Sequence, residues 1–148
     1  MIQRKQTLFL LAVAIIAIVQ FFIPFQTLAC DDKNWQICLM PSCSADVMGT
    51  NIYVAMILNI IIVILSIAII FLYKNRVLQY KLANLLMLFN VFLIGLFFIF
   101  SYIKEGTIGT ISYQFGSFLP IVSAVFAFLA AHFIKKDEQL VRSADRIR

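Results

Sequence analysis

Charged residues are scarce in this sequence. Asp, Glu, Lys and Arg make up 13% of its 148 residues and hydrophobic residues 63%, against about 25% and about 45–50% in a soluble domain. A soluble domain must cover its surface with polar groups, and this chain has too few of them. The composition also argues against disorder, collagen and a coiled coil. We therefore expect a single-domain integral membrane protein whose exterior faces lipid.

Ionisable side chains are missing from the apolar stretches in particular. The four longest stretches contain no Asp, Glu, Lys or Arg, and the single histidine, His132, lies near the end of the last one. Proton relays and intramembrane catalysts commonly use ionisable groups at depth. The motifs HExxH, GxGxxG and GxSxG and the P-loop are also absent. We therefore expect no enzyme activity and no bound metal or cofactor.

Four stretches are long and apolar enough to predict helices that cross a bilayer, which takes about 20 mostly apolar residues. Pro24 follows the first stretch, where its missing N–H ends or kinks a helix. Ser117 and Pro120 suit the N-cap and the first turn of the last helix. The expected fold is an all-α, four-helix membrane bundle in one domain, residues 1–148, with spans at about 7–23, 52–73, 82–102 and 117–134 and a tail at 135–148.

The basic residues indicate which ends of the spans lie together. Ten of the twelve Lys and Arg lie before the first span, in the turn expected at 74–81 and in the tail, and only Lys33 and Lys104 lie elsewhere. Because loops rich in Lys and Arg stay in the cytoplasm, this pattern places both termini there. It predicts a multi-pass protein of the cell's inner (plasma) membrane.

The first apolar stretch has an alternative interpretation. Thr27-Leu28-Ala29-Cys30 loosely resembles the site at which bacterial lipoproteins are cleaved and lipidated, which would make the stretch a signal. Thr27 stands where such sites usually carry leucine, and the stretch before Pro24 is longer than a typical signal core. We therefore expect the first span to remain in the protein.

Few polar side chains interrupt the spans. Side-chain amides in hydrocarbon seek partners on neighbouring helices, so we expect these residues to hold the bundle together: Asn59, Asn84, Asn90 and Ser123. Mostly small residues recur at helical spacing in the fourth span, which lets backbones approach closely, either inside the bundle or between protomers, and we expect the bundle interior. They are Gly116, Pro120, Ser123, Ala127 and Ala131.

All three cysteines, Cys30, Cys38 and Cys43, lie in the loop expected outside the cytoplasm, where disulfides persist. We expect one structural disulfide and one free thiol, and three pairings are open. The alternative is a membrane thiol-disulfide oxidoreductase that uses Cys38 and Cys43. The spacing of these two is not CxxC, and the other external loop has no cysteine to relay electrons.

The tail places Leu140, Ala144 and Ile147 on one helical face, and Glu138 can reach Arg142 one turn on. This pattern predicts either a continuation of the fourth helix or a short amphipathic helix along the membrane surface.

Three segments carry a family resemblance: residues 1–7 (MIQRKQT), 73–79 (YKNRVLQ) and 134–146 (IKKDEQLVRSADR). They resemble a bacterial family of short four-pass membrane proteins classed as domain of unknown function 4293. The resemblance covers the whole chain. It implies four helices, an inner-membrane location, and no assigned activity or binding site.

These segments all lie on the face expected in the cytoplasm, and none is needed merely to span a bilayer. We expect a non-enzymatic accessory or scaffold protein whose basic surface binds a protein partner or anionic lipid, and no nucleic acid. A small-solute channel or transporter subunit is a further alternative, which requires an oligomer or a polar pore. The expected cytoplasmic patch comprises Gln3, Arg4, Lys74, Arg76, Lys81, Arg142, Asp145 and Arg146.

Overall fold

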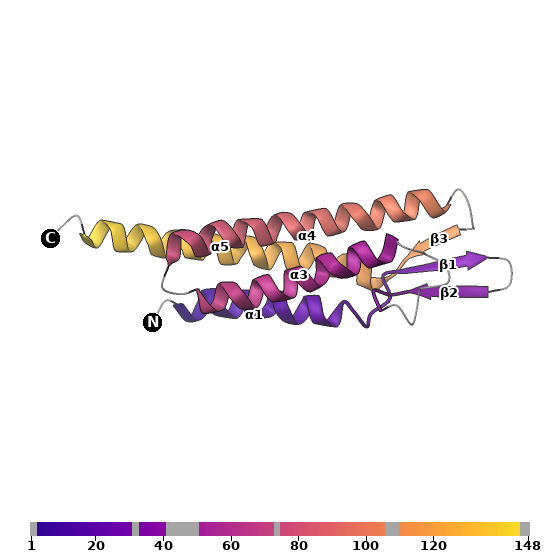
Figure 1. Ribbon diagram of the computed structural model, residues 1–148, viewed down its shortest axis with the longest axis horizontal. Helices are drawn as coiled ribbons and strands as arrows, with labels where there is room; N and C mark the ends of the chain where they lie inside the picture. Colours follow the sequence, from indigo (N-terminus) through magenta and orange to yellow (C-terminus); the bar gives the residue numbers. More distant parts are fainter. Residues whose placement is uncertain (1–2, 31–32, 41–50, 73–74, 106–109, 146–148) are drawn as a thin grey trace.

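The computed structural model describes residues 3–30, 33–40, 51–72, 75–105 and 110–145. Long helices run side by side and form an elongated bundle (Figure 1). Both chain ends lie at one end of the bundle, which we call the termini end, and three short strands lie at the other, the sheet end (Figure 1). The helices are α1 (Gln3–Val19), α3 (Asn51–Phe71), α4 (Arg76–Glu105) and α5 (Leu119–Asp145).

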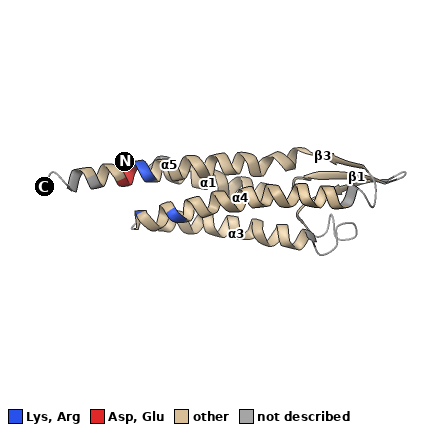
Figure 2. Ribbon diagram, turned by 90° about the horizontal axis from the view of Figure 1, so that it is seen from above, with Lys and Arg blue, Asp and Glu red and all other residues tan. Residues whose placement is uncertain are grey.

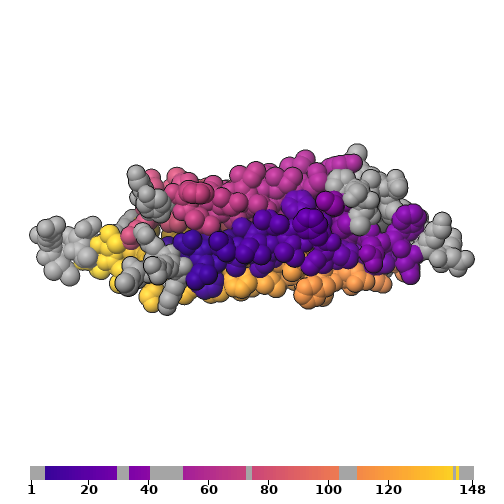
Figure 3. Space-filling view, turned by 90° about the horizontal axis from the view of Figure 1, so that it is seen from below, coloured from indigo at the N-terminus to yellow at the C-terminus, as the bar shows by residue number. Residues whose placement is uncertain are grey.

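The helices close a ring around one core. α1 contacts α3 and α5, and α4 contacts the same two helices; Figure 3 shows α1 between α3 and α5 along one face. The core is filled by apolar side chains, among them Leu10, Ile62, Leu86, Leu93 and Ala127. The resulting fold is an all-α helical bundle.

The outer faces of the helices are apolar as well. Ile64 on α3 and Leu88 on α4 are both 62% exposed, and an exterior this apolar is typical of contact with lipid. Three helices are long and apolar enough to cross a membrane: Ile52–Phe71, Arg76–Ile103 and Phe115–Val141. The chain is therefore a helical membrane protein.

The first predicted span is too long at its end. α1 stops at Val19, and its apolar part, Gln6–Val19, is shorter than the three long spans. The N–H groups of Phe21 and Phe22 donate to the oxygens of residues three positions back, at 3.1 Å each. This tight turn and Pro24 end the helix before the chain enters the first strand.

The turn predicted at 74–81 is also too long, because α4 already begins at Arg76. The N–H of Gln79 donates to the main-chain oxygen of Asn75 at 2.9 Å, which gives Asn75 the position of an N-cap. At the same end of the bundle, α5 extends beyond the apolar residues and continues to Asp145. The expectation that the tail continues the fourth helix is confirmed.

A small sheet closes the other end of the bundle and was not predicted. It is antiparallel, in the order β2-β1-β3, and consists of β1 (Gln26–Cys30), β2 (Lys33–Ile37) and β3 (Thr110–Tyr113). Leu28 in the central strand pairs with Trp35 and Ile111. The sheet thereby joins two segments that are far apart in the sequence.

Two contacts fasten the sheet to α4. The ring of Phe25 stacks on that of Phe97, with 4.3 Å between the centroids. The side-chain amide of Gln26 donates to the main-chain oxygen of Phe97 at 3.1 Å and to Ser101 Oγ. The sheet is therefore tied to the end of a membrane helix through both apolar and polar contacts.

The chain approaches itself closely where α5 begins. The N–H of Gly116 donates to Pro24 O at 3.2 Å, and a Cβ at position 116 would lie 2.5 Å from that oxygen. The predicted N-cap, Ser117, lies instead inside a 3-10 turn, η1 (Phe115–Phe118), and its hydroxyl donates to Phe25 O. The prediction of Pro120 in the first turn of the helix is confirmed.

Candidate functional site at the termini end

The structure gathers the described part of the expected patch at the termini end. The Lys and Arg coloured blue in Figure 2 lie there, on α4 and α5. Lys74 and Arg146 lie outside the described residues. The remaining patch residues belong to the helix ends that meet there, with Gln3 and Arg4 on α1, Arg76 and Lys81 on α4, and Arg142 and Asp145 on α5.

Asp137 connects three helices at this end, through its buried carboxylate and its main-chain oxygen. Asp137 of α5 is 7% exposed, and its Oδ2 accepts a hydrogen bond from Nε2 of Gln6 in α1. The same Nε2 group lies 3.3 Å from Phe133 O. Arg76 of α4 donates from Nη1 to the main-chain oxygen of Asp137 at 3.4 Å. A carboxylate at this depth requires such partners because burial removes its hydration.

Exposed lysines lie on α4 and α5 at this end. Lys81, Lys135 and Lys136 are exposed. The ammonium of Lys135 lies 5.9 Å from the centroid of the Tyr80 ring, within the range of a cation–π interaction. Tyr80 itself packs against a small core of Ala83, Ala131 and Ile134 between α4 and α5. Because Asp137 points inward, it leaves the outer surface of this region basic.

The last turns of α5 project beyond the other helices, in line with the bundle axis (Figure 1). Leu140 and Val141 are 51% and 42% exposed on this projection. A helix that lay along the membrane surface would cross the bundle axis instead. The alternative of a surface-lying amphipathic tail is therefore wrong.

The described side chains at this end are mainly basic and apolar. The described residues contain no group of three His, Cys, Asp or Glu side chains that could hold a metal ion. His132 lies with its ring 5.9 Å from that of Phe133 and 6.5 Å from that of Phe128. Exposed ammonium groups and exposed apolar side chains therefore lie near one another on this part of α5.

The polar residues expected within the spans behave differently from one another. Asn59, Asn90 and Ser123 are buried, whereas Asn84 is exposed on the outer face of α4, so its expected role between helices is wrong. Asn59 Nδ2 donates across helices to Ala17 O at 2.9 Å. Asn90 Nδ2 donates within its own helix, to Leu86 O at 2.8 Å.

The stripe of mostly small residues on the fourth span lies inside the bundle, as expected. All five of its members are buried: Gly116, Pro120, Ser123, Ala127 and Ala131. Gln6, Gln20 and Asp137 are buried as well, although no sequence pattern predicted this. Asp137 lies in a run of charged residues, which favoured a solvated position.

The cysteines lie at the sheet end. Cys38 is disulfide-bonded. Strand pairing places Cys30 opposite Lys33, which is five residues from Cys38 and so about 16 Å along the strand. Disulfides join residues whose Cα atoms lie within about 7 Å, so Cys30 is not the partner of Cys38. The remaining cysteine, Cys43, lies outside the described residues.

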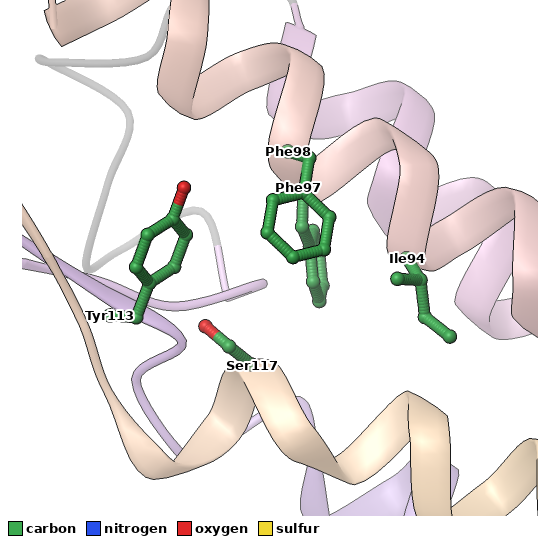
Figure 4. A pocket seen from close by; sticks show the side chains of 5 residues that line it. All are labelled: Ile94, Phe97, Phe98, Tyr113 and Ser117. Carbon is green, nitrogen blue, oxygen red and sulfur yellow. The ribbon is translucent and has the colours of Figure 1, made fainter.

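A small cavity lies between α4 and the start of α5. Ile94, Phe97 and Phe98 line it from α4, and Tyr113 and Ser117 line it from the opposite side (Figure 4). Its volume is about 10 Å³, close to the space that one water molecule needs. This cavity is too small to hold an organic substrate.

A family model described as domain of unknown function DUF4293 matches residues 2–147 of the chain. A comparison with curated proteins finds no match.

Proposed function

The chain belongs to the DUF4293 family, whose description assigns no function, and we propose a function from the geometry of the termini end. The protein is a non-enzymatic accessory or scaffold protein of the inner membrane, with both termini in the cytoplasm. It binds a cytoplasmic or membrane protein partner through the projecting part of α5 and the basic side chains at its base. We call this region the α5 surface: Arg76, Lys81, Lys135, Lys136, Leu140 and Val141.

One observation carries the proposal: α5 extends past the bundle and carries exposed apolar side chains, Leu140 and Val141, next to exposed lysines. The projection follows the bundle axis (Figure 1), so it leads away from the lipid and toward the aqueous phase. Apolar side chains in that position favour a protein partner over lipid headgroups.

The charge of this end supports a cytoplasmic location. Basic residues next to membrane helices are retained on the cytoplasmic side during insertion. Each Lys or Arg near an anionic leaflet also contributes about 1 kcal/mol of attraction. The lysines therefore serve the orientation of the bundle, while Leu140 and Val141 contribute the contact specific to the partner.

Photocrosslinking tests this proposal. A photoreactive amino acid at Val141 of the full chain, irradiated in native membranes, is expected to give adducts with a specific protein. The matched control carries the same group at Ile64, which is also exposed but lies in the middle of the apolar helix Ile52–Phe71, whereas Val141 is the last residue of Phe115–Val141. The control is expected to give lipid adducts. Lipid adducts alone at Val141 would contradict a protein partner and favour anionic headgroups.

The second candidate is a membrane thiol-disulfide oxidoreductase, favoured by the disulfide of Cys38. A redox-active disulfide is reduced and reoxidised during turnover, whereas a structural one stays oxidised. Trapping of free thiols by alkylation in growing cells separates the two. A population of reduced Cys38 that rises when its reoxidation is blocked would favour the oxidoreductase.

A further inference from the structure

Each helix of the bundle, or the residue that directly follows it, carries at least one fully buried polar side chain. Four of these residues, one for each helix, are 0–1% exposed, although the core around them is apolar. They are Gln20, which follows α1 directly, Asn59 on α3, Asn90 on α4 and Ser123 on α5.

Contacts at the termini end show that these residues lie at one level on α4 and α5. Arg76 donates to the main-chain oxygen of Asp137, which aligns the two antiparallel helices there. Fourteen residues separate Arg76 from Asn90, and fourteen separate Ser123 from Asp137. Asn90 and Ser123 are therefore the same distance from that contact along their helices.

A contact between α3 and α4 places Asn59 at the same level. Gln79 of α4 donates from Nε2 to Ile69 O of α3 at 3.2 Å. Eleven residues separate Gln79 from Asn90, and ten separate Asn59 from Ile69. The difference of one residue corresponds to about 1.5 Å along a helix axis. Asn59 thus lies opposite Asn90.

Two further contacts place the end of α1 at the same level as Asn59, Asn90 and Ser123. Asn59 Nδ2 donates to Ala17 O, and Gln20 lies about one turn beyond Ala17. The rings of Phe9 and Phe133 stack at 5.4 Å, with eleven residues from Phe9 to Gln20 and ten from Ser123 to Phe133. Gln20, Asn59, Asn90 and Ser123 therefore form one layer across the bundle, which we call the polar layer.

Three atoms of the polar layer lack a hydrogen-bond partner among the described residues: Gln20 Nε2, Asn59 Oδ1 and Ser123 Oγ. The first is a donor, the second is an acceptor, and the hydroxyl is both. All three belong to side chains that are at least 99% buried. Buried polar groups are normally paired with protein or ordered water, because hydrocarbon offers them nothing.

We propose that the polar layer is a binding site for water. A ligand at this site must accept a hydrogen bond from Gln20 Nε2 and donate one to Asn59 Oδ1. Water does both, whereas a metal cation cannot accept the first bond and a simple anion cannot donate the second. The bound water links α1, α3 and α5 at the level where Asn59 Nδ2 also donates to Ala17 O.

A high-resolution structure of the full chain in lipid nanodiscs tests the proposal directly. The expected result is a water oxygen within about 3.2 Å of at least two of the atoms Gln20 Nε2, Asn59 Oδ1 and Ser123 Oγ. Direct hydrogen bonds that close the layer without water would overturn it, and so would a bound cation.

Substitution of Ser123 gives a second, independent test. Removing the hydroxyl with Ser123→Ala breaks a water-mediated link and is expected to lower the midpoint of thermal unfolding by about 2 °C. If the hydroxyl had no partner, its removal would leave the midpoint unchanged or raise it, which would contradict the proposal. Ser66→Ala is the matched control, because Ser66 is equally buried but donates to Val63 O of its own helix at 2.8 Å. It is expected to change the midpoint by less than Ser123→Ala.

Discussion

Gln6 and Asp137 lie 131 residues apart in the sequence, and the side-chain amide of Gln6 donates to the buried carboxylate of Asp137. The bond joins the first helix of the bundle to the last at the end where both chain termini lie (Figure 1). Arg76 of α4 reaches the same residue through its main-chain oxygen. This contact fixes the base of the α5 projection, from which the proposed partner surface extends.

Replacing Gln6 with leucine is expected to destabilise the protein, because it leaves the Asp137 carboxylate buried without its side-chain donor. The expected loss in the free energy of unfolding is about 1–3 kcal/mol, measured by thermal unfolding of the purified chain in detergent. Gln139→Ala is the control, because Gln139 is exposed on α5, the helix that carries Asp137. It is expected to change the free energy of unfolding by at most about 0.5 kcal/mol. If both substitutions lowered the free energy of unfolding equally, this would contradict a stabilising role of the Gln6–Asp137 hydrogen bond.

Two glycines are expected to respond to alanine in opposite directions. Gly116→Ala places a Cβ 2.5 Å from the main-chain oxygen of Pro24, and a clash with backbone is expected to cost about 1–3 kcal/mol. At Gly95, within α4, no atom lies within 4 Å of the added Cβ, and Gly95→Ala is expected to stabilise the helix by about 0.5–1 kcal/mol. Unfolding midpoints of the two variants measure this difference. A Gly116→Ala variant as stable as the natural chain would show that the sheet end can shift away from α5.

Peptide mapping under non-reducing conditions is expected to identify a disulfide between Cys38 and Cys43, with Cys30 recovered as the alkylated thiol. The reason is the strand register, which pairs Cys30 with Lys33 at the far end of the hairpin from Cys38. Consequently, Cys30→Ser is expected to leave the disulfide intact. A disulfide between Cys30 and Cys38 would require a different pairing of β1 and β2.

The apolar residues predicted the helical fold, because a run of such residues has one solution in lipid, a helix whose backbone bonds are all internal. The predicted ends were less accurate. α4 begins at Arg76 rather than at Leu82, since a helix that leaves the hydrocarbon does not need apolar residues to continue. α1 ends at Val19, since Pro24 and the following strand impose a turn before the apolar residues run out.

Features that depend on contacts between distant segments could not be predicted in this way. The strands have only four or five residues each. One of the two strands that pair with β1 is β3, which lies more than eighty residues further along the sequence. Asp137 is buried and accepts a hydrogen bond from Gln6 near the other end of the chain, a contact that no local sequence pattern contains. Asn59 and Asn84 have similar settings in the sequence, yet one faces the core and the other faces outward.

The most direct test of the proposed orientation is the reaction of native lysines with a membrane-impermeant amine reagent, applied to intact cells and followed by mass analysis. Lys33 lies in β2 at the sheet end, whereas Lys135 and Lys136 lie on α5 at the termini end. The account predicts that Lys33 is modified in intact cells and that Lys135 and Lys136 are modified only after the membrane is permeabilised. Modification of Lys136 in intact cells, with Lys33 protected, would contradict it.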